Sequence, residues 1–325
     1  MRLLDLVAHG PALRSADSRE SRLPIPSDFA QDVLTCPLRL VLNDDLVRCS
    51  TELGFADGDR VAGCSDLIRV PSERLWVEWN DVPRKACLEQ IAHLPPTGGV
   101  PARRAGALIR AHSDGRSGEV RTFWSTPDDR VYCAALVAEF DLDTEIRAAE
   151  GAELSIFDGG YGGVALLNEP AIDALLAHIR FRFETPWLDY YRAARLPQSD
   201  QVMVLRTALG TSAFDLPMLF ALFLLMSAKD GARRRPVNLE RLNRSRRAAG
   251  KFPLLEHIEV NSCIAGQHSA AGRAPIGDSR SSRRLHHVRG HLARRGHTIY
   301  WRSPHLRGSA RLGVIKTRTV ELAFN

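Results

Sequence analysis

Alternating apolar and polar residues mark several strands in the first half of the chain. After Pro71, short segments of period two lie between turn residues, at 74–79, 106–111, 119–124 and 131–137. Successive side chains of a strand point to opposite faces of a sheet, so this pattern predicts an antiparallel sheet of about four strands. Residues 113–118 (SDGRSG), between the second and third segments, have the composition of a hairpin turn.

Helical spacing of apolar residues follows, over 169–183, 187–195 and 199–208. The run LPMLFALFLLMSA at 216–228 has 13 residues. A bilayer span needs about 20, so we expect a buried helix there. NLERLNRSRRAA at 238–249 predicts an arginine-rich surface helix that leads into a strand at 255–260. The fold class expected is α+β, with antiparallel sheets and helices.

Charge divides the chain into two parts. Residues 229–325 hold 21 Lys/Arg and 6 Asp/Glu, a formal charge of +15, whereas residues 1–228 carry a formal −9. Single cores rarely exceed about 250–300 residues. We therefore expect an acidic α+β body at 1–228 and a small basic helix-plus-sheet module at 229–325, with a mobile segment at about 261–282. Such charge asymmetry favours nucleic acid as the partner of the basic part.

Location and cofactors are inferred from what the residues lack. Asp5 interrupts the apolar run at the N-terminus, which does not resemble a secretion signal, so we expect a cytoplasmic protein without a membrane partner. Cys263 and His268, with His287 and His291, are a conceivable zinc set. The two pairs are separated mainly by Gly, Ser, Ala and Arg, and we expect neither a metal nor a cofactor.

The most distinctive motif is HHVRGH, at residues 286–291. On a single strand, His287, Arg289 and His291 would share one face. Two imidazoles beside a guanidinium can cleave RNA without a metal: one histidine removes the 2′-hydroxyl proton, the other protonates the leaving oxygen, and the arginine stabilises charge on phosphorus. Two other interpretations stay open: the basic residues bind phosphates without chemistry, or they serve the structure alone.

Nucleic-acid contacts are expected from the motif, the segment that follows it and the arginine-rich helix. The candidate residues are Arg284, His286, Arg289, His291, Arg294, Arg295, Arg302, Arg307, Arg244, Arg246 and Arg247. Tyr300 and Trp301 lie among them and are suited to stack on a base. Alternation along a strand indicates that one of these two aromatic residues belongs to the core.

A second candidate site lies in the acidic body. If residues 75–79 form a strand, Trp76 and Glu78 share the face opposite Leu75, Val77 and Trp79. An exposed indole beside a carboxylate would suit a groove for a peptide with a basic N-terminus. We take Trp76, Glu78 and Trp79 as candidate peptide-binding residues. The alternative is that both faces are covered and both indoles pack in the core.

The segment RLHHVRGHLARRGHTIYWRSPHLRG, residues 284–308, resembles a C-terminal signature of a widespread family of phage, prophage and plasmid proteins. The family includes the type V-A anti-CRISPR protein that acts on production of the type V-A effector nuclease. Arg284, His286, Arg289, Gly290 and His291 match the signature. Three positions depart from it: Leu285 stands in place of proline, Val288 in place of arginine and Leu292 in place of tryptophan.

The resemblance implies a protein of a mobile element that suppresses expression of a specific target. Members recognise the nascent N-terminal peptide of that target and cause loss of its mRNA, so the partners implied are a ribosome–nascent-chain complex or RNA, and the target's N-terminal peptide. Two alternatives come from the residues themselves. One is a metal-independent endoribonuclease, and the other is a DNA-binding regulator of a mobile element.

Overall fold

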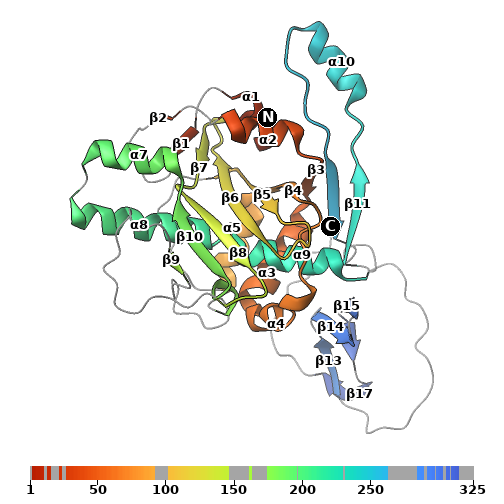
Figure 1. Cartoon of the computed structure of the whole chain (residues 1–325). Coiled ribbons are helices and arrows are strands. Elements are labelled where there is room, and N and C mark those ends of the chain that lie inside the picture. The colour runs from red at the N-terminus through yellow and green to blue at the C-terminus, as the bar shows by residue number, and fades with distance from the viewer. Residues whose placement is uncertain are drawn as a thin grey trace.

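The chain folds as an α+β protein, as the sequence predicts, with helices on both faces of a large sheet (Figure 1). The structure is a computed structural model, and it describes residues 2–10, 13–15, 22–23, 27–91, 102–145, 161–162, 174–195, 197–229, 231–262, 284–288, 291–296, 298–302, 305–307 and 309–314. Its helices are α1 (Leu3–His9), α2 (Ser27–Thr35), α3 (Asp44–Ala56), α4 (Gly58–Ala62), α5 (Asp81–Ile91), α7 (Thr185–Ala194), α8 (Gln198–Ala213), α9 (Leu216–Ser227) and α10 (Glu240–Ala248).

The large sheet is mixed, which corrects the expectation of a purely antiparallel one. Its order is β11-β12-β3-β4-β5-β6-β7-β1-β2, and β8 pairs with β6 and β10, and β10 with β9. The strands are β1 (Leu13–Ser15), β2 (Arg22–Leu23), β3 (Leu38–Leu42), β4 (Arg74–Asn80), β5 (Arg104–Ala111), β6 (Ser117–Ser125), β7 (Val131–Cys133), β8 (Leu136–Asp141), β9 (Tyr161–Gly162), β10 (Ile179–Phe183), β11 (Ala232–Pro236) and β12 (Ile258–Ser262). β3 runs parallel to β4 and to β12 because helices cross between these strands.

The alternation predicted for β4 separates two hydrophobic cores. Leu75, Val77 and Trp79 pack with α3, α5 and α9 on one face of the sheet. Trp76 packs with α1, α2 and Phe123 on the other face, 5.6 Å from the Phe123 ring centre. Both faces of the strand are therefore covered, and all four of these β4 side chains are fully buried.

Helix α9 is buried almost throughout, because its run of apolar residues leaves no polar face. It passes α3 so closely that a Cβ on Gly54 would lie 2.4 Å from the carbonyl oxygen of Pro217. At the start of α9, the buried Arg84 bridges Asp81 at 2.9 Å and Asp215 at 2.6 Å. Burial raises the pKa of Asp215 to about 6, and the Arg84 guanidinium opposes that rise.

Glu78 anchors the first helix to the sheet. Its carboxylate is fully buried and accepts the backbone N–H groups of Leu3 at 3.1 Å and Leu4 at 2.9 Å, at the start of α1. The same carboxylate pairs with Arg104 of β5 and accepts the Trp76 indole N–H at 3.4 Å. A negative charge at a helix N-terminus is favourable, so this contact fixes α1 electrostatically as well as by packing.

Three other expectations are corrected. Residues 179–183 form strand β10 rather than the end of a helix, because Ile179, Phe181 and Phe183 alternate with arginine and face the core. The expected strand at 131–137 is two strands, β7 and β8. The expected boundary between the body and the basic module, at residue 228, does not separate two sheets. β12 lies after this boundary and pairs with β3 of the body. The expected mobile segment overlaps β12 at 261–262, and the rest of it lies outside the described residues.

The C-terminal strands form two small sheets beneath the body (Figure 1). They are β13 (Arg284–Val288), β14 (His291–Arg295), β15 (Thr298–Arg302), β16 (His305–Arg307) and β17 (Ser309–Val314). β14 and β15 form a hairpin whose turn contains Gly296 at φ 61°. This hairpin contacts the body, because Lys229 N–H donates to the Ile299 carbonyl at 3.2 Å and Ile299 is buried in the main core.

Gly54→Ala is expected to destabilise the protein by about 1–3 kcal/mol, because overpacking at the Pro217 carbonyl outweighs the gain in helix propensity. Gly210→Ala on α8 is the matched control, since no described atom lies within 4 Å of its added Cβ. That substitution should be neutral or stabilising by up to about 1 kcal/mol. Chemical denaturation of both variants measures the difference. Equal stabilities would contradict the close approach of α3 and α9.

Glu78→Gln is expected to lower stability by about 3 kcal/mol, because it leaves Arg104 without its buried counter-charge. The matched control is Glu89→Gln on the exposed side of α5, which should change stability by less than about 0.5 kcal/mol. Thermal and chemical unfolding measure both. Hydrogen exchange at Leu3 and Leu4 N–H should also accelerate in the Glu78→Gln variant relative to wild type, and unchanged protection would argue against this anchor.

Candidate nucleic-acid interface

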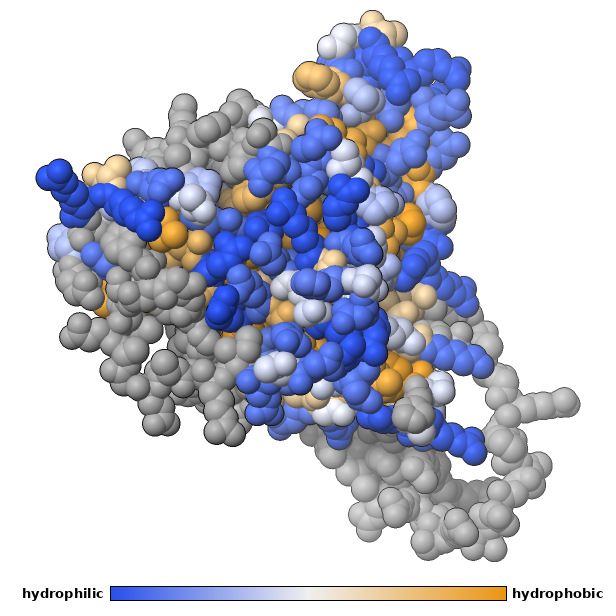
Figure 2. Space-filling model, in the orientation of Figure 1, coloured by the Kyte–Doolittle hydropathy of each residue, from blue (hydrophilic) through white to orange (hydrophobic). Residues whose placement is uncertain are grey.

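A basic arm projects from the edge of the large sheet, formed by β11, α10 and β12 (Figure 1). Residues 232–262, which make up the arm, contain eight Lys/Arg and three Asp/Glu. Most of these cations are exposed: Arg233, Arg234, Arg235, Arg241, Arg244, Arg247 and Lys251. Figure 2 shows mainly hydrophilic surface over this projection. The arm is thus the part of the described structure where positive charge is concentrated.

Polar bonds, rather than an apolar face, hold α10 in place. Asn238 Oδ1 accepts Glu240 N–H at 2.9 Å at the start of the helix. At its end, Gly250 adopts φ 68°, and Lys251 N–H donates to the Arg246 carbonyl at 2.9 Å, which completes a Schellman turn. The carboxamide of Asn243, the buried residue of α10, bonds both the N–H and the carbonyl of Leu254.

This arrangement orients the helix arginines. With Asn243 directed inward, Arg241, Arg244 and Arg247 lie on the exposed part of α10, and each is about 4.5 Å further along the axis than the last. The Arg244 side chain is 80% exposed, and its 3.7 Å pair with Glu240 contributes little in water. A row of exposed guanidinium groups of this kind suits contacts to successive phosphates.

The side chains of the hairpin β14–β15 are less available for nucleic-acid contacts than the sequence indicated. Arg294 pairs with Asp66 of the body at 3.1 and 2.9 Å. Arg302 donates to the Tyr300 hydroxyl at 3.2 Å and lies 5.4 Å from the centre of the Tyr300 ring. Trp301 packs partly against the main core, which confirms that one of the two aromatic residues belongs there. Arg295 is exposed.

The HHVRGH motif does not lie on one strand. β13 ends at Val288 and belongs to the three-stranded sheet, whereas β14 begins at His291 and pairs with β15. The hypothesis that His287, Arg289 and His291 share one strand face is therefore wrong, because alternation does not continue from one strand into another. Arg289 lies outside the described residues, as do the side chains of Arg284, His286, His287, His291 and Arg307.

The prediction of a peptide-binding groove in the body is also wrong. Trp76, Glu78 and Trp79 each have 0% exposure, so none of them lines an open surface. Helix α1 covers the face that carries Trp76 and Glu78, and the alternative in which both indoles pack in the core is confirmed. Nothing in the sequence near Glu78 indicates that its partners are the N–H groups of Leu3 and Leu4.

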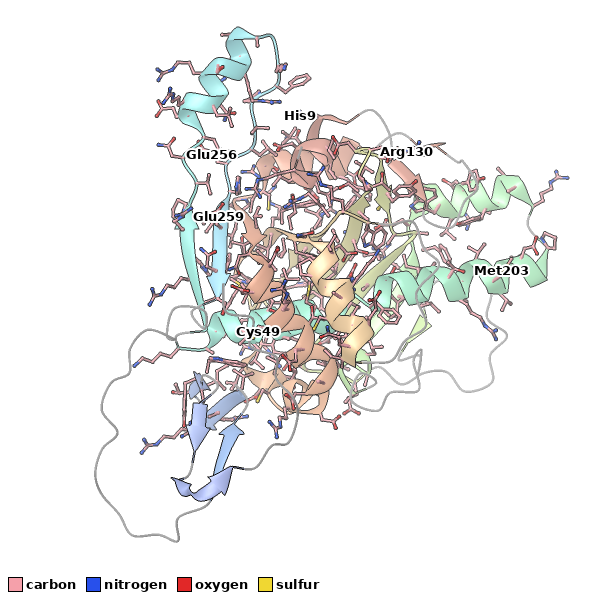
Figure 3. All side chains as sticks on the ribbon, turned by 180° about the vertical axis from the view of Figure 1, so that it is seen from behind. His9, Cys49, Arg130, Met203, Glu256 and Glu259 are labelled. Carbon is pink, nitrogen blue, oxygen red and sulfur yellow. The ribbon has the colours of Figure 1, made fainter. Side chains whose placement is uncertain are left out.

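A pocket of about 230 Å³ lies where the arm meets α1, and sequence reasoning missed it. Its lining includes Asp5 and His9 of α1, and Arg246, Lys251 and Phe252 of the arm. Figure 3 shows His9 at the end of α1, beside the arm. The one signal in the sequence was an acidic residue at the centre of LLDLV, where an apolar residue would be expected on a buried helix.

Asp5 connects α1 to the arm. Its Oδ1 accepts Leu255 N–H at 2.9 Å, and its Oδ2 is buried without a hydrogen-bond partner among the described residues. Burial raises the pKa of the Asp5 carboxyl group, and the Leu255 N–H bond opposes that rise. His257, buried nearby, has its pKa lowered by burial, and its Nδ1 lies 3.0 Å from the Leu255 carbonyl.

The described ranges contain no group of three His, Cys, Asp or Glu side chains placed to hold a metal ion. Cys263 and His268 of the conceivable zinc set lie outside those ranges. Across the described helices, none has the length and apolar character needed to cross a membrane. Comparisons with protein-family models, curated proteins and solved structures found no match to this chain.

Proposed function

We propose that this protein binds RNA through the basic arm. The observation that carries the proposal is the row of exposed arginines on α10, held outward by the Asn243 clamp. Exposed Arg233 and Arg234 on β11 extend the positive surface toward the body, whereas Arg235 pairs with Glu259 at 2.9 Å. Because residues 1–228 carry a formal −9, the rest of the body repels a polyanion and directs it to the arm.

Phe252 favours a single-stranded ligand. It is 67% exposed where the arm meets α1, next to the cationic Arg246 and Lys251. Bases stack on exposed aromatic rings, and arginines beside such a ring neutralise the adjoining phosphates. A rigid duplex hides its base faces, so the combination suits a single strand better than duplex DNA, which is the partner of the alternative DNA-binding regulator.

The biological role that we propose is suppression of a specific target protein through its mRNA, as the family resemblance implies. The exposed arginines of α10 support the mRNA part of this role. Recognition of a nascent N-terminal peptide has no support at Trp76, Glu78 and Trp79, which are buried. A peptide-binding surface therefore has to be sought by crosslinking to ribosome–nascent-chain complexes, with sequencing of the RNA that is recovered.

RNA affinity is expected to fall steeply as salt rises, because each neutralised phosphate releases counterions. Replacing Arg241, Arg244 and Arg247 with Ala should make the negative slope of log K against log salt shallower by about 2, because each phosphate contact on a single strand contributes about 0.7. Fluorescence anisotropy with a labelled oligoribonucleotide measures this slope. Duplex DNA of the same length is the competitor, and preferential binding of the duplex would favour the DNA-binding regulator.

The matched control removes three exposed arginines elsewhere: Arg60→Ala, Arg192→Ala and Arg206→Ala on α4, α7 and α8. This control changes the net charge equally, so it separates a local interface from a general effect of charge. It should leave the salt slope within experimental error of wild type. Equal losses in the two triple variants would contradict a binding site on the arm.

RNA incubated with the purified protein in EDTA is expected to stay intact between about pH 5 and 8, the range in which histidine titrates. The reason is that His287 and His291 lie on strands of different sheets. Denaturing gels of end-labelled RNA measure cutting. Cleavage with a bell-shaped pH profile that His291→Ala abolishes would instead establish the metal-independent endoribonuclease.

A further inference from the structure

The pocket between α1 and the arm has one acidic wall. Asp5 is 2% exposed, with Oδ1 engaged by Leu255 N–H, and Oδ2 without a partner among the described residues. An ionised carboxylate has about four acceptor positions, and the buried Oδ2 is the oxygen of Asp5 that no described donor occupies. His9 stands on the same wall, and its buried Nε2 likewise has no hydrogen-bond partner in the described part of the chain.

An aromatic pair forms the rim. The rings of His9 and Phe252 are stacked, with centres 4.7 Å apart and planes 6° from parallel. Phe252 is 67% exposed although it is large and apolar, which costs solvation free energy unless a ligand covers it. The exposed Phe252 ring, stacked on the half-buried His9 ring beside unsatisfied polar atoms, suits a planar group that carries N–H donors, such as a nucleobase.

Two cationic residues also line the pocket. Arg246 Nε donates to the Phe252 carbonyl at 2.8 Å, which fixes this side chain at the rim, and the exposed Lys251 closes the Schellman turn with its N–H group. A phosphate is the natural ligand of such a pair. At about 230 Å³, the pocket is smaller than the 300–1,000 Å³ typical of drug-sized ligands, so it suits a single base rather than a longer segment.

We propose that this pocket binds one guanine nucleotide, with the N–H edge of the base at Asp5 and the phosphate toward Arg246 and Lys251. Guanine fits because its N1–H and N2–H groups are adjacent donors. Adenine and cytosine present an acceptor beside their amino group, and that acceptor would face the carboxylate. The inference rests on the proposed RNA binding, in which the nucleotide belongs to an RNA strand bound along α10. A free guanine nucleotide offers the same chemical groups.

The first test compares labelled oligouridylates with and without a single guanosine, by fluorescence anisotropy. Guanosine should tighten binding about tenfold, the value of one hydrogen bond to a charged group. Inosine lacks the amino group and should give a smaller gain. Equal affinity for all three oligonucleotides would overturn the guanine pocket while leaving the arm as an RNA-binding surface.

Asp5→Asn tests the acceptor directly. Its amide oxygen can keep the Leu255 N–H bond, while the amino group replaces the free oxygen with a donor. The guanosine preference should disappear, whereas affinity for oligouridylate should stay within about twofold of wild type. A purely structural Asp5 would instead lower the melting temperature and weaken both oligonucleotides equally, and that result would overturn the proposal.

Phe252→Ala is the second variant, chosen because an exposed ring contributes little to folding. It should weaken binding of the guanosine oligonucleotide by about tenfold through lost stacking. Met203→Ala on α8, also an exposed apolar residue at 63%, is the matched control and should bind like wild type (Figure 3). Equal affinities of the two variants would contradict a stacking role for Phe252.

Calorimetry with guanosine monophosphate separates the two sources of the nucleotide. Binding of the mononucleotide that depends on Asp5, without binding of any oligonucleotide, would support the pocket and overturn the proposed RNA function. A guanosine preference seen only in oligonucleotides would assign the pocket to a strand held by the arm. Failure of both ligands to bind would overturn both proposals.

Discussion

The buried carboxylate of Glu78 joins segments that are far apart in the sequence. It accepts the first N–H groups of α1, pairs with Arg104 of β5 and accepts the Trp76 indole N–H. Burying a carboxylate is costly unless donors surround it, and these donors come from a helix terminus, a neighbouring strand and its own strand. The position of α1 over the sheet, and with it the second hydrophobic core, therefore depends on this one side chain.

The basic arm depends in turn on α1. Asp5, in the first turn of α1, accepts Leu255 N–H from the returning segment of the arm, and His9 stacks on Phe252. Glu78, α1 and the arm thus form a continuous series of polar contacts from the sheet to the pocket. Because α10 buries little apolar surface, these contacts and the Asn243 clamp, rather than a hydrophobic face, determine where its arginines lie.

The spacing and type of neighbouring residues predicted those helices and strands whose formation depends on nearby residues. The alternation in β4, the apolar run of α9 and the arginine-rich α10 are all where the sequence placed them. Strand β10 was missed, because Ile179, Phe181 and Phe183 fit both a strand and the end of the preceding helical spacing. The parallel pairing of β12 with β3 and the burial of Glu78 depend on residues far away in the chain. The spacing of apolar residues along the sequence therefore does not predict them.

The arginines of the arm do not all need the same explanation. β11 is the edge strand of the sheet, and exposed Arg233, Arg234 and Arg235 there have a structural use, because charge on an edge strand prevents pairing with other chains. That argument does not extend to α10, which has no strand edge to protect. Arg241, Arg244 and Arg247 repel one another on a short helix that buries little, and this cost remains unless an anion neutralises them. The helix arginines, rather than the strand arginines, are therefore the evidence for a polyanionic ligand.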